Sequence, residues 1–199
     1  MSTDYAQAFN DALDAAESGD DDRARALLEN VVAADGRDGE AVLMLARLER
    51  SAGLNDQARV RVEGLLELVP NHVDGLVELA DMLLEKGDPG AAAGHLRTVL
   101  VERPNHWEAL LLLGDAFSDA GAFSEASAAY QECLESNPFS SDAWFNLASA
   151  QEAQGNLLAA SAAYQGYLQV RPDADDRREV LAHVAELEAA GQSDPQSEG

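Results

Sequence analysis

The side chains of this 199-residue sequence that could bind a metal or move a proton do not form a known catalytic pattern. His72 and His106 each follow a Pro-Asn dipeptide, so the same short motif occurs twice along the chain. Packed helices lie about 10 Å apart, whereas zinc ligands lie about 2 Å from the metal, so we interpret both histidines as turn residues at helix starts. Phosphate-binding glycine loops, Cys/His zinc spacings and nucleophile-elbow motifs are also missing from the sequence. The sequence therefore predicts a protein that is not an enzyme, with no metal site and no cofactor.

A second set of reactive groups, the carboxylates, recurs at the same spacing as the two histidines. Four of them follow one another at this constant interval, at Glu40, Asp74, Glu108 and Asp142. We expect each in the first turn of a helix, where a carboxylate interacts favourably with the helix dipole. Large apolar residues follow the same period, at Phe9, Leu43, Val77, Leu111 and Phe145. Parallel columns of acidic and apolar side chains suit the binding of a peptide with basic and apolar residues.

Other residues that recur at the same period indicate which helices and turns position these columns. These further columns are the turn glycines Gly19, Gly53, Gly87, Gly121 and Gly155; the alanines Ala24, Ala58, Ala92, Ala126 and Ala160; the small residues Ala12, Ala46, Ala80, Gly114 and Ala148; the apolar residues Val32, Leu66, Leu100, Leu134 and Leu168; and the prolines Pro70, Pro104, Pro138 and Pro172. Self-similarity at a fixed period of this length is typical of a repeat array.

Each repeat reads as two short amphipathic helices around a glycine turn. In the last repeat, Trp144, Leu147 and Ala148 share one helical face before the turn, and Ala160 and Tyr164 share one after it. Helices joined so closely must pack antiparallel. The predicted pairs are Tyr5–Glu17 with Asp20–Ala34, Gly39–Ala52 with Asn55–Val69, Val73–Glu85 with Asp88–Glu102, Trp107–Ala120 with Phe123–Ser136, and Asp142–Gln154 with Leu157–Val170.

A final segment, Asp175–Ala190, is predicted to be a capping helix, because a terminal repeat needs a cover for its apolar face. Val180, Val184 and Leu187, with Leu181 and Ala185, form its apolar side. Residues 191–199 are expected to form a disordered polar tail. We therefore predict a single all-α domain over residues 1–190, with repeats at about 5–36, 39–70, 73–104, 107–138 and 141–172.

This pattern resembles the tetratricopeptide repeat, a helix-turn-helix unit of about 34 residues. The best match is Trp144-x-x-Leu147-Ala148, followed by Gly155, Ala160, Tyr164 and Pro172; the next is Leu110-x-x-Leu113-Gly114-x-x-Phe117, followed by Gly121, Ala126, Tyr130 and Pro138. The resemblance covers about Tyr5–Pro172 and implies a right-handed α-solenoid. Asp11 and Gly36 depart from the pattern in the first repeat. Glu49 and Gln151 stand where the family has a large apolar residue, which predicts looser local packing.

In tetratricopeptide repeats, the side of the first helix that faces away from its partner lines a concave groove. The resemblance implies that the acidic and apolar columns lie there, together with Arg47, Asp81 and Asp115 of the same register. The predicted peptide-binding groove is therefore lined by Phe9, Glu40, Leu43, Arg47, Asp74, Val77, Asp81, Glu108, Leu111, Asp115, Asp142 and Phe145. Carboxylates outnumber arginines in this lining, which suits a peptide with Lys or Arg beside apolar anchors.

Other functions remain open from the sequence. Some members of the family hold C-terminal carboxylates with groove cations, but Arg47, Arg50, Asn10 and Asn146 are too few and too dispersed for that mode. The chain could instead be a scaffold that self-assembles, with its first repeat docked in the groove of another copy. It could also be a regulatory or substrate-holding subunit of an enzyme or of a secretion or assembly complex.

Composition narrows the classes of partner. With 13 basic and 37 acidic residues, the formal charge is −24, which excludes non-specific attraction to nucleic acid. This acidity and the single lysine fit either a basic ligand or a salt-adapted host. Cys133 is the one cysteine, and its apolar column predicts a buried thiol. With no secretory signal or membrane-spanning run in the sequence, the cytoplasm is the expected location.

Overall fold

The computed structural model describes residues 3–193, and within them every regular element is an α-helix. The helices are α1 (Thr3–Glu17), α2 (Asp21–Ala34), α3 (Gly39–Ser51), α4 (Asn55–Leu68), α5 (Val73–Glu85), α6 (Pro89–Glu102), α7 (Trp107–Asp119), α8 (Phe123–Ser136), α9 (Ser141–Ala153), α10 (Leu157–Val170) and α11 (Arg177–Ser193). The prediction of an all-α fold made of helix pairs is confirmed, and the observed ends lie within about two residues of the expected ones for the ten paired helices.

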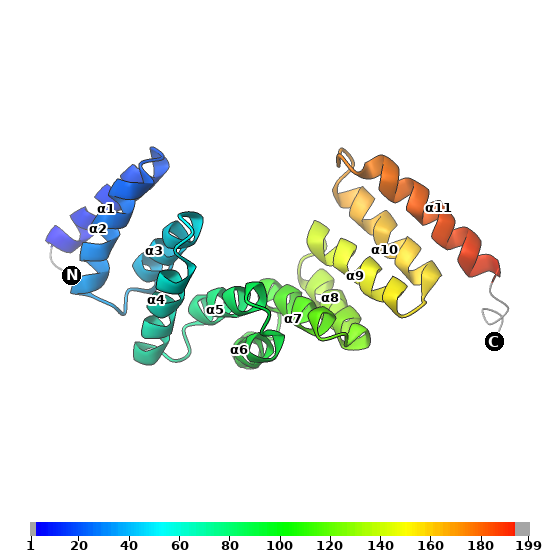
Figure 1. Cartoon of the computed structure of the whole chain (residues 1–199), viewed down its shortest axis with the longest axis horizontal. Coiled ribbons are helices and arrows are strands. Elements are labelled where there is room, and N and C mark those ends of the chain that lie inside the picture. Colours follow the sequence, from blue (N-terminus) through cyan, green and yellow to red (C-terminus); the bar gives the residue numbers. More distant parts are fainter. Residues whose placement is uncertain (1–2, 194–199) are drawn as a thin grey trace. The chain divides into compact units, whose positions relative to one another are not determined.

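The helices, which are labelled in Figure 1, divide into two compact units. Unit 1 contains α1 to α5 and ends at Lys86, and unit 2 begins at Gly87 and contains α6 to α11. The division falls at the turn between the two helices of the third repeat. Each unit is described separately below.

The turns within repeats are fixed by glycines in the left-handed region. Gly121 has φ of 73°, a value that a residue with a Cβ adopts only at a cost. Its N–H donates to the Ser118 carbonyl at 2.9 Å, and the next N–H, of Ala122, donates to the Phe117 carbonyl at 2.8 Å. These two bonds satisfy carbonyls at the end of α7 and reverse the chain into α8.

Side chains at the starts of first helices cap free N–H groups. The Nδ1 atoms of His72 and His106 accept hydrogen bonds from the N–H groups of Gly75 and Ala109 at 3.1 and 3.3 Å. The interpretation of both histidines as turn residues at helix starts is therefore confirmed. In each case the Nδ1 atom is engaged at the N-terminus of the helix that the histidine precedes.

Unit 1 has an apolar core that contains a completely buried carboxylate, Glu49. Val42, Ala46, Ala58, Val62 and Leu65 pack between α3 and α4. Glu49 is completely buried beside them, and its Oε1 accepts a hydrogen bond from Arg61 Nε at 2.6 Å. This partner on α4 lets a carboxylate occupy the large apolar position.

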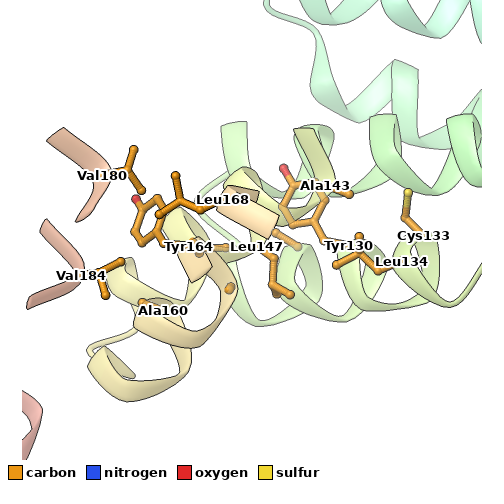
Figure 2. Packing of buried hydrophobic residues seen from close by; sticks show 14 of the residues in the cluster. Tyr130, Cys133, Leu134, Ala143, Leu147, Ala160, Tyr164, Leu168, Val180 and Val184 are labelled. Atoms are coloured by element: carbon orange, nitrogen blue, oxygen red, sulfur yellow. The ribbon is translucent and has the colours of Figure 1, made fainter. Parts of the chain in front are cut away.

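The apolar core of unit 2 is formed by residues of the successive helices α7, α8, α9, α10 and α11 (Figure 2). Tyr130 is almost completely buried, and its ring lies directly against Gly114, where an added Cβ would overlap it. Glycine at this position therefore allows a tyrosine on the facing helix. Cys133 is buried as expected, with its Sγ 3.3 Å from the Trp107 carbonyl, and burial raises the pKa of its thiol to about 11.

The last helix, α11, continues three residues beyond the predicted end at Ala190. Gly191 is buried against Leu158 of α10, and a Cβ at this position would lie 2.9 Å from that side chain. The absence of a side chain thus lets α11 stay close to α10 through Gly191, where a disordered tail was expected. The rest of the predicted tail, 194–199, lies outside the described residues.

Candidate peptide-binding surface

Unit 1 contains a pocket of about 650 Å³ on the predicted lining of its first helices. Its residues come from α3 and from the start of α5: Glu40, Leu43, Met44, Arg47, Leu48, His72 and Asp74. We call this cavity the acidic pocket. It combines an apolar surface with two exposed carboxylates, Glu40 and Asp74, from the same column of adjacent repeats.

A close helix approach builds the acidic pocket. The His72 ring lies against Gly39, where an added Cβ would overlap it. This contact brings the start of α5 next to the start of α3, so Asp74 and Glu40 occur at one cavity. Both side chains lie in first turns, the part of a helix in which acidic residues are favoured.

The arginines of the unit 1 lining are already paired with carboxylates of α5. Glu78 is 7% exposed and accepts hydrogen bonds from Arg47 at 3.0 Å and from Arg50 at 2.7 Å. Arg50 also lies 2.8 Å from Asp81 and 2.6 Å from Glu85. Burial alone would lower the pKa of Arg50, but these carboxylates raise it above its ordinary value. Asp81 therefore helps to fix α3 to α5 and is less available to a ligand than the sequence suggested.

Asp115 has an equally structural position in unit 2. It accepts hydrogen bonds from Tyr130 Oη at 2.7 Å and from Asn146 Nδ2 at 2.9 Å, which joins α7 to α8 and α9. Burial raises the pKa of Asp115, and the two donors oppose that change. The same burial, together with the adjacent Asp115, raises the pKa of Tyr130. Asp115 therefore holds helices together and presents little free charge.

The other predicted residues of unit 2 are more accessible. Glu108 and Asp142 are exposed in the first turns of α7 and α9. Phe145 is 37% exposed and packs edge-on against Tyr164 and Tyr167, with ring centroids 5.4 and 5.5 Å apart. The outer surface of the Phe145 ring is therefore accessible to a ligand, while its edge packs within the helix pair.

The apolar column is less open than the sequence suggested. Leu43 is only 5% exposed, and Phe9, Val77 and Leu111 are half-buried. Sequence reasoning missed Met44, Leu48 and His72, which line the acidic pocket with Leu43. Glu40, Met44 and Leu48 follow one another at intervals of four residues, and this spacing predicts that they lie along one side of α3.

No group of three or more His, Cys, Asp or Glu side chains suited to a metal ion occurs in the described part of the chain. Likewise, none of the helices between residues 3 and 193 has the length and apolar character needed to cross a membrane.

The repeated helix pairs define a class of protein, which comparison of the sequence with protein-family models identifies. One tetratricopeptide repeat model matches residues 15–79 and 83–138, and a second matches residues 111–176. These matches span well over half of the chain, so the chain belongs to the tetratricopeptide repeat family. No curated protein sequence matches it.

Several solved structures share the fold at low sequence identity. PilW, a type IV pilus biogenesis factor, is 20% identical with a TM-score of 0.81, over 100% of this chain and 97% of its own. MamA from Desulfovibrio magneticus RS-1 is 18% identical with a TM-score of 0.77, over 88% and 99%. YrrB, described as a TPR protein with an unusual peptide-binding site, is 18% identical with a TM-score of 0.70, over 90% of both chains. At this identity, the likeness concerns the fold.

Membership of the tetratricopeptide repeat family supports a role in protein–protein interaction. The members of this family typically act as interaction modules without catalysis, in agreement with the interpretation of the sequence.

Proposed function

We propose that this chain is a non-enzymatic interaction module that binds a peptide segment of a partner protein through the first-helix lining. The peptide carries Lys or Arg next to apolar side chains. One observation carries this proposal: the acidic pocket places two exposed carboxylates, Glu40 and Asp74, beside the apolar side chains of Met44 and Leu48.

The chemistry of the acidic pocket favours a long cationic side chain. Lys and Arg bury their methylene groups on apolar surface while the charged head stays near polar groups. Met44 and Leu48 supply such a surface, and the carboxylates of Glu40 and Asp74 supply acceptors at its edge. Arg47, although in the same cavity, is partly neutralised because it bonds to Glu78. The net charge of −24 attracts a basic segment from a distance.

A displayed library of random peptides tests the proposal with three forms of the full chain. The wild type should enrich sequences that combine Lys or Arg with apolar residues. The variant Glu40→Lys with Asp74→Lys should lose them. The control variant, Asp56→Lys with Glu125→Lys, changes the charge equally and also replaces exposed first-turn carboxylates, but on the second helices α4 and α8.

Retention of the same peptides by the wild type and the control, and their loss from the acidic-pocket variant, supports the proposal. Equal enrichment by all three forms contradicts it, because binding then lies elsewhere. Binding of a selected peptide should also weaken as salt increases, since exposed charges are screened.

A further inference from the structure

The capping helix α11 occupies the place of the first helix of a sixth repeat. Its His183 bonds to Glu152 of α9 at 2.9 Å. In unit 1, Arg50 and Asp81 form an ion pair at the same two repeat positions, at 2.8 Å. Both pairs join the first helix of one repeat to the first helix of the next.

A second pair of contacts fixes the same register. Ser161 Oγ of α10 donates to Glu188 of α11 at 3.0 Å, and Gln154 Nε2 donates to Ser127 Oγ at 2.8 Å. Glu188 and Ser161 lie one repeat period after Gln154 and Ser127. The contacts of α11 with α9 and α10 therefore repeat those that a first helix makes with the preceding repeat.

This register identifies the side of α11 that a second helix would cover. In the other repeats, that side carries Leu147 and Ala148, or Leu113 and Gly114, all of them buried. The corresponding residues of α11 are Leu181, which is 45% exposed, and Ala182, which is also exposed. Ala185 continues the same side and is exposed too. No element among residues 3–193 covers this side of α11, which we call the open face; it consists of Arg178, Leu181, Ala182 and Ala185.

We propose that the open face binds an amphipathic α-helix of a partner protein, which completes the sixth repeat from outside the chain. The second helices of the chain indicate what this helix must carry. Each has a completely buried alanine four residues before a larger apolar residue, as in Ala58 and Val62 or Ala160 and Tyr164. The partner helix therefore carries a small residue followed one turn later by a large apolar residue, and this pair packs on Ala182 as Ala58 and Val62 pack with Ala46.

Charge decides between a partner and a second copy. Two copies of a chain with net charge −24 repel each other.

The charges beside the open face indicate which charges the partner helix carries. Glu186 is 79% exposed next to Ala185. In the second repeat, the position that corresponds to Ala185 is Glu49, which bonds to Arg61 in the first half of α4. A basic residue at this place in the partner helix lies next to Ala185, one residue before the exposed Glu186. Arg178, at the other end of the open face, lies where the negative end of the partner's helix dipole arrives.

The chain itself supplies a probe for this proposal. A peptide with the sequence of residues 55–68, stapled on its outer side, has Ala58, Val62 and Arg61 at the required places. Stapling is needed because free helices of this length are marginal in water. Binding to the full chain is measured by fluorescence anisotropy, with wild type, Ala182→Glu and the control Ala162→Glu, which changes an exposed alanine of α10.

The wild type and the control should bind the probe in a saturable manner, while Ala182→Glu should weaken binding by about tenfold or more. Because Ala182 is exposed, its variant should keep the melting curve of the wild type. The proposal is overturned if the wild type shows no saturable binding below about 1 mM, or if Ala182→Glu binds equally well. It is also overturned in favour of a second copy if the chain dimerises alone and Ala182→Glu abolishes the dimer in sedimentation. The acidic-pocket variant should bind the probe like the wild type, which separates this surface from the peptide-binding one.

Discussion

The buried ion pair between Glu49 and Arg61 makes an asymmetric prediction about stability. Glu49 is completely buried, whereas Arg61 is 27% exposed and also lies 3.7 Å from Glu29. One oxygen of Glu49, Oε2, has no hydrogen-bond partner. Removal of Arg61 therefore leaves a buried carboxylate unpaired, whereas removal of Glu49 leaves a partly exposed guanidinium.

We expect Arg61→Met to destabilise unit 1 by about 2–3 kcal/mol. Removal of one partner of a fully buried pair costs about 3–5 kcal/mol, and the partial exposure of Arg61 lets water reach the vacated side, which reduces the cost. Glu49→Leu should stay within about 1 kcal/mol of the wild type, because leucine restores an apolar side chain of suitable size and the remaining guanidinium can be hydrated. The double variant should resemble Glu49→Leu.

Urea denaturation followed by two probes measures these effects without screening the charges. Both tryptophans, Trp107 and Trp144, lie in unit 2, so fluorescence reports that unit, while far-ultraviolet circular dichroism reports both. Arg61→Met should lower the urea midpoint of the dichroism transition that belongs to unit 1. Equal losses for Arg61→Met and Glu49→Leu would refute the reasoning, since they would mean that both charges depend on each other to the same extent.

Two other predictions concern unit 2. Gly114→Ala should destabilise it by about 1–3 kcal/mol, because the new methyl overlaps the Tyr130 ring, and the tryptophan-detected urea midpoint should fall. In a chain that carries Tyr130→Leu, the same Gly114→Ala change should lower the midpoint less, because leucine leaves room for the methyl. The hydrogen bond that His183 donates to the Glu152 carboxylate raises the pKa of His183, and Glu186 raises it further. A raised pKa in the folded state gives stability that is complete below the unfolded value of about 6.5 and disappears as pH rises through the folded value. The melting temperature of the wild type should therefore exceed that of His183→Gln at pH 5.5–6 by more than at pH 9, and a constant difference would contradict this assignment.

Most of the helix pattern could be predicted because it depends on local chemistry that recurs in every repeat. Gly121 and its equivalents end first helices, and His72 and His106 cap the starts of others, so nearly every boundary followed from neighbouring residues. The C-terminal end of α11 was missed because Gly191, a residue that normally ends helices, packs against Leu158 from a different helix.

The candidate site was only partly predictable for a related reason. Glu40, Asp74, Glu108 and Asp142 lie in the first turns of helices, as expected, and their side chains are exposed. Whether a carboxylate of the lining is free depends on partners from other helices. Asp81 is paired with Arg50, and Asp115 bonds to both Tyr130 and Asn146.

The sequence alone determined the repeat period, the helix pairs and the acidic and apolar columns, since each follows from spacing along the chain. Only the tertiary structure decided which of those side chains face solvent. Leu43 became buried, Asp81 and Asp115 became links between helices, and Met44 and Leu48 joined the acidic pocket. It also showed that α11 stands in the register of a first helix with Leu181 uncovered. The physical reason is that burial and pairing are set by contacts between residues of different helices, and spacing within one helix does not specify them.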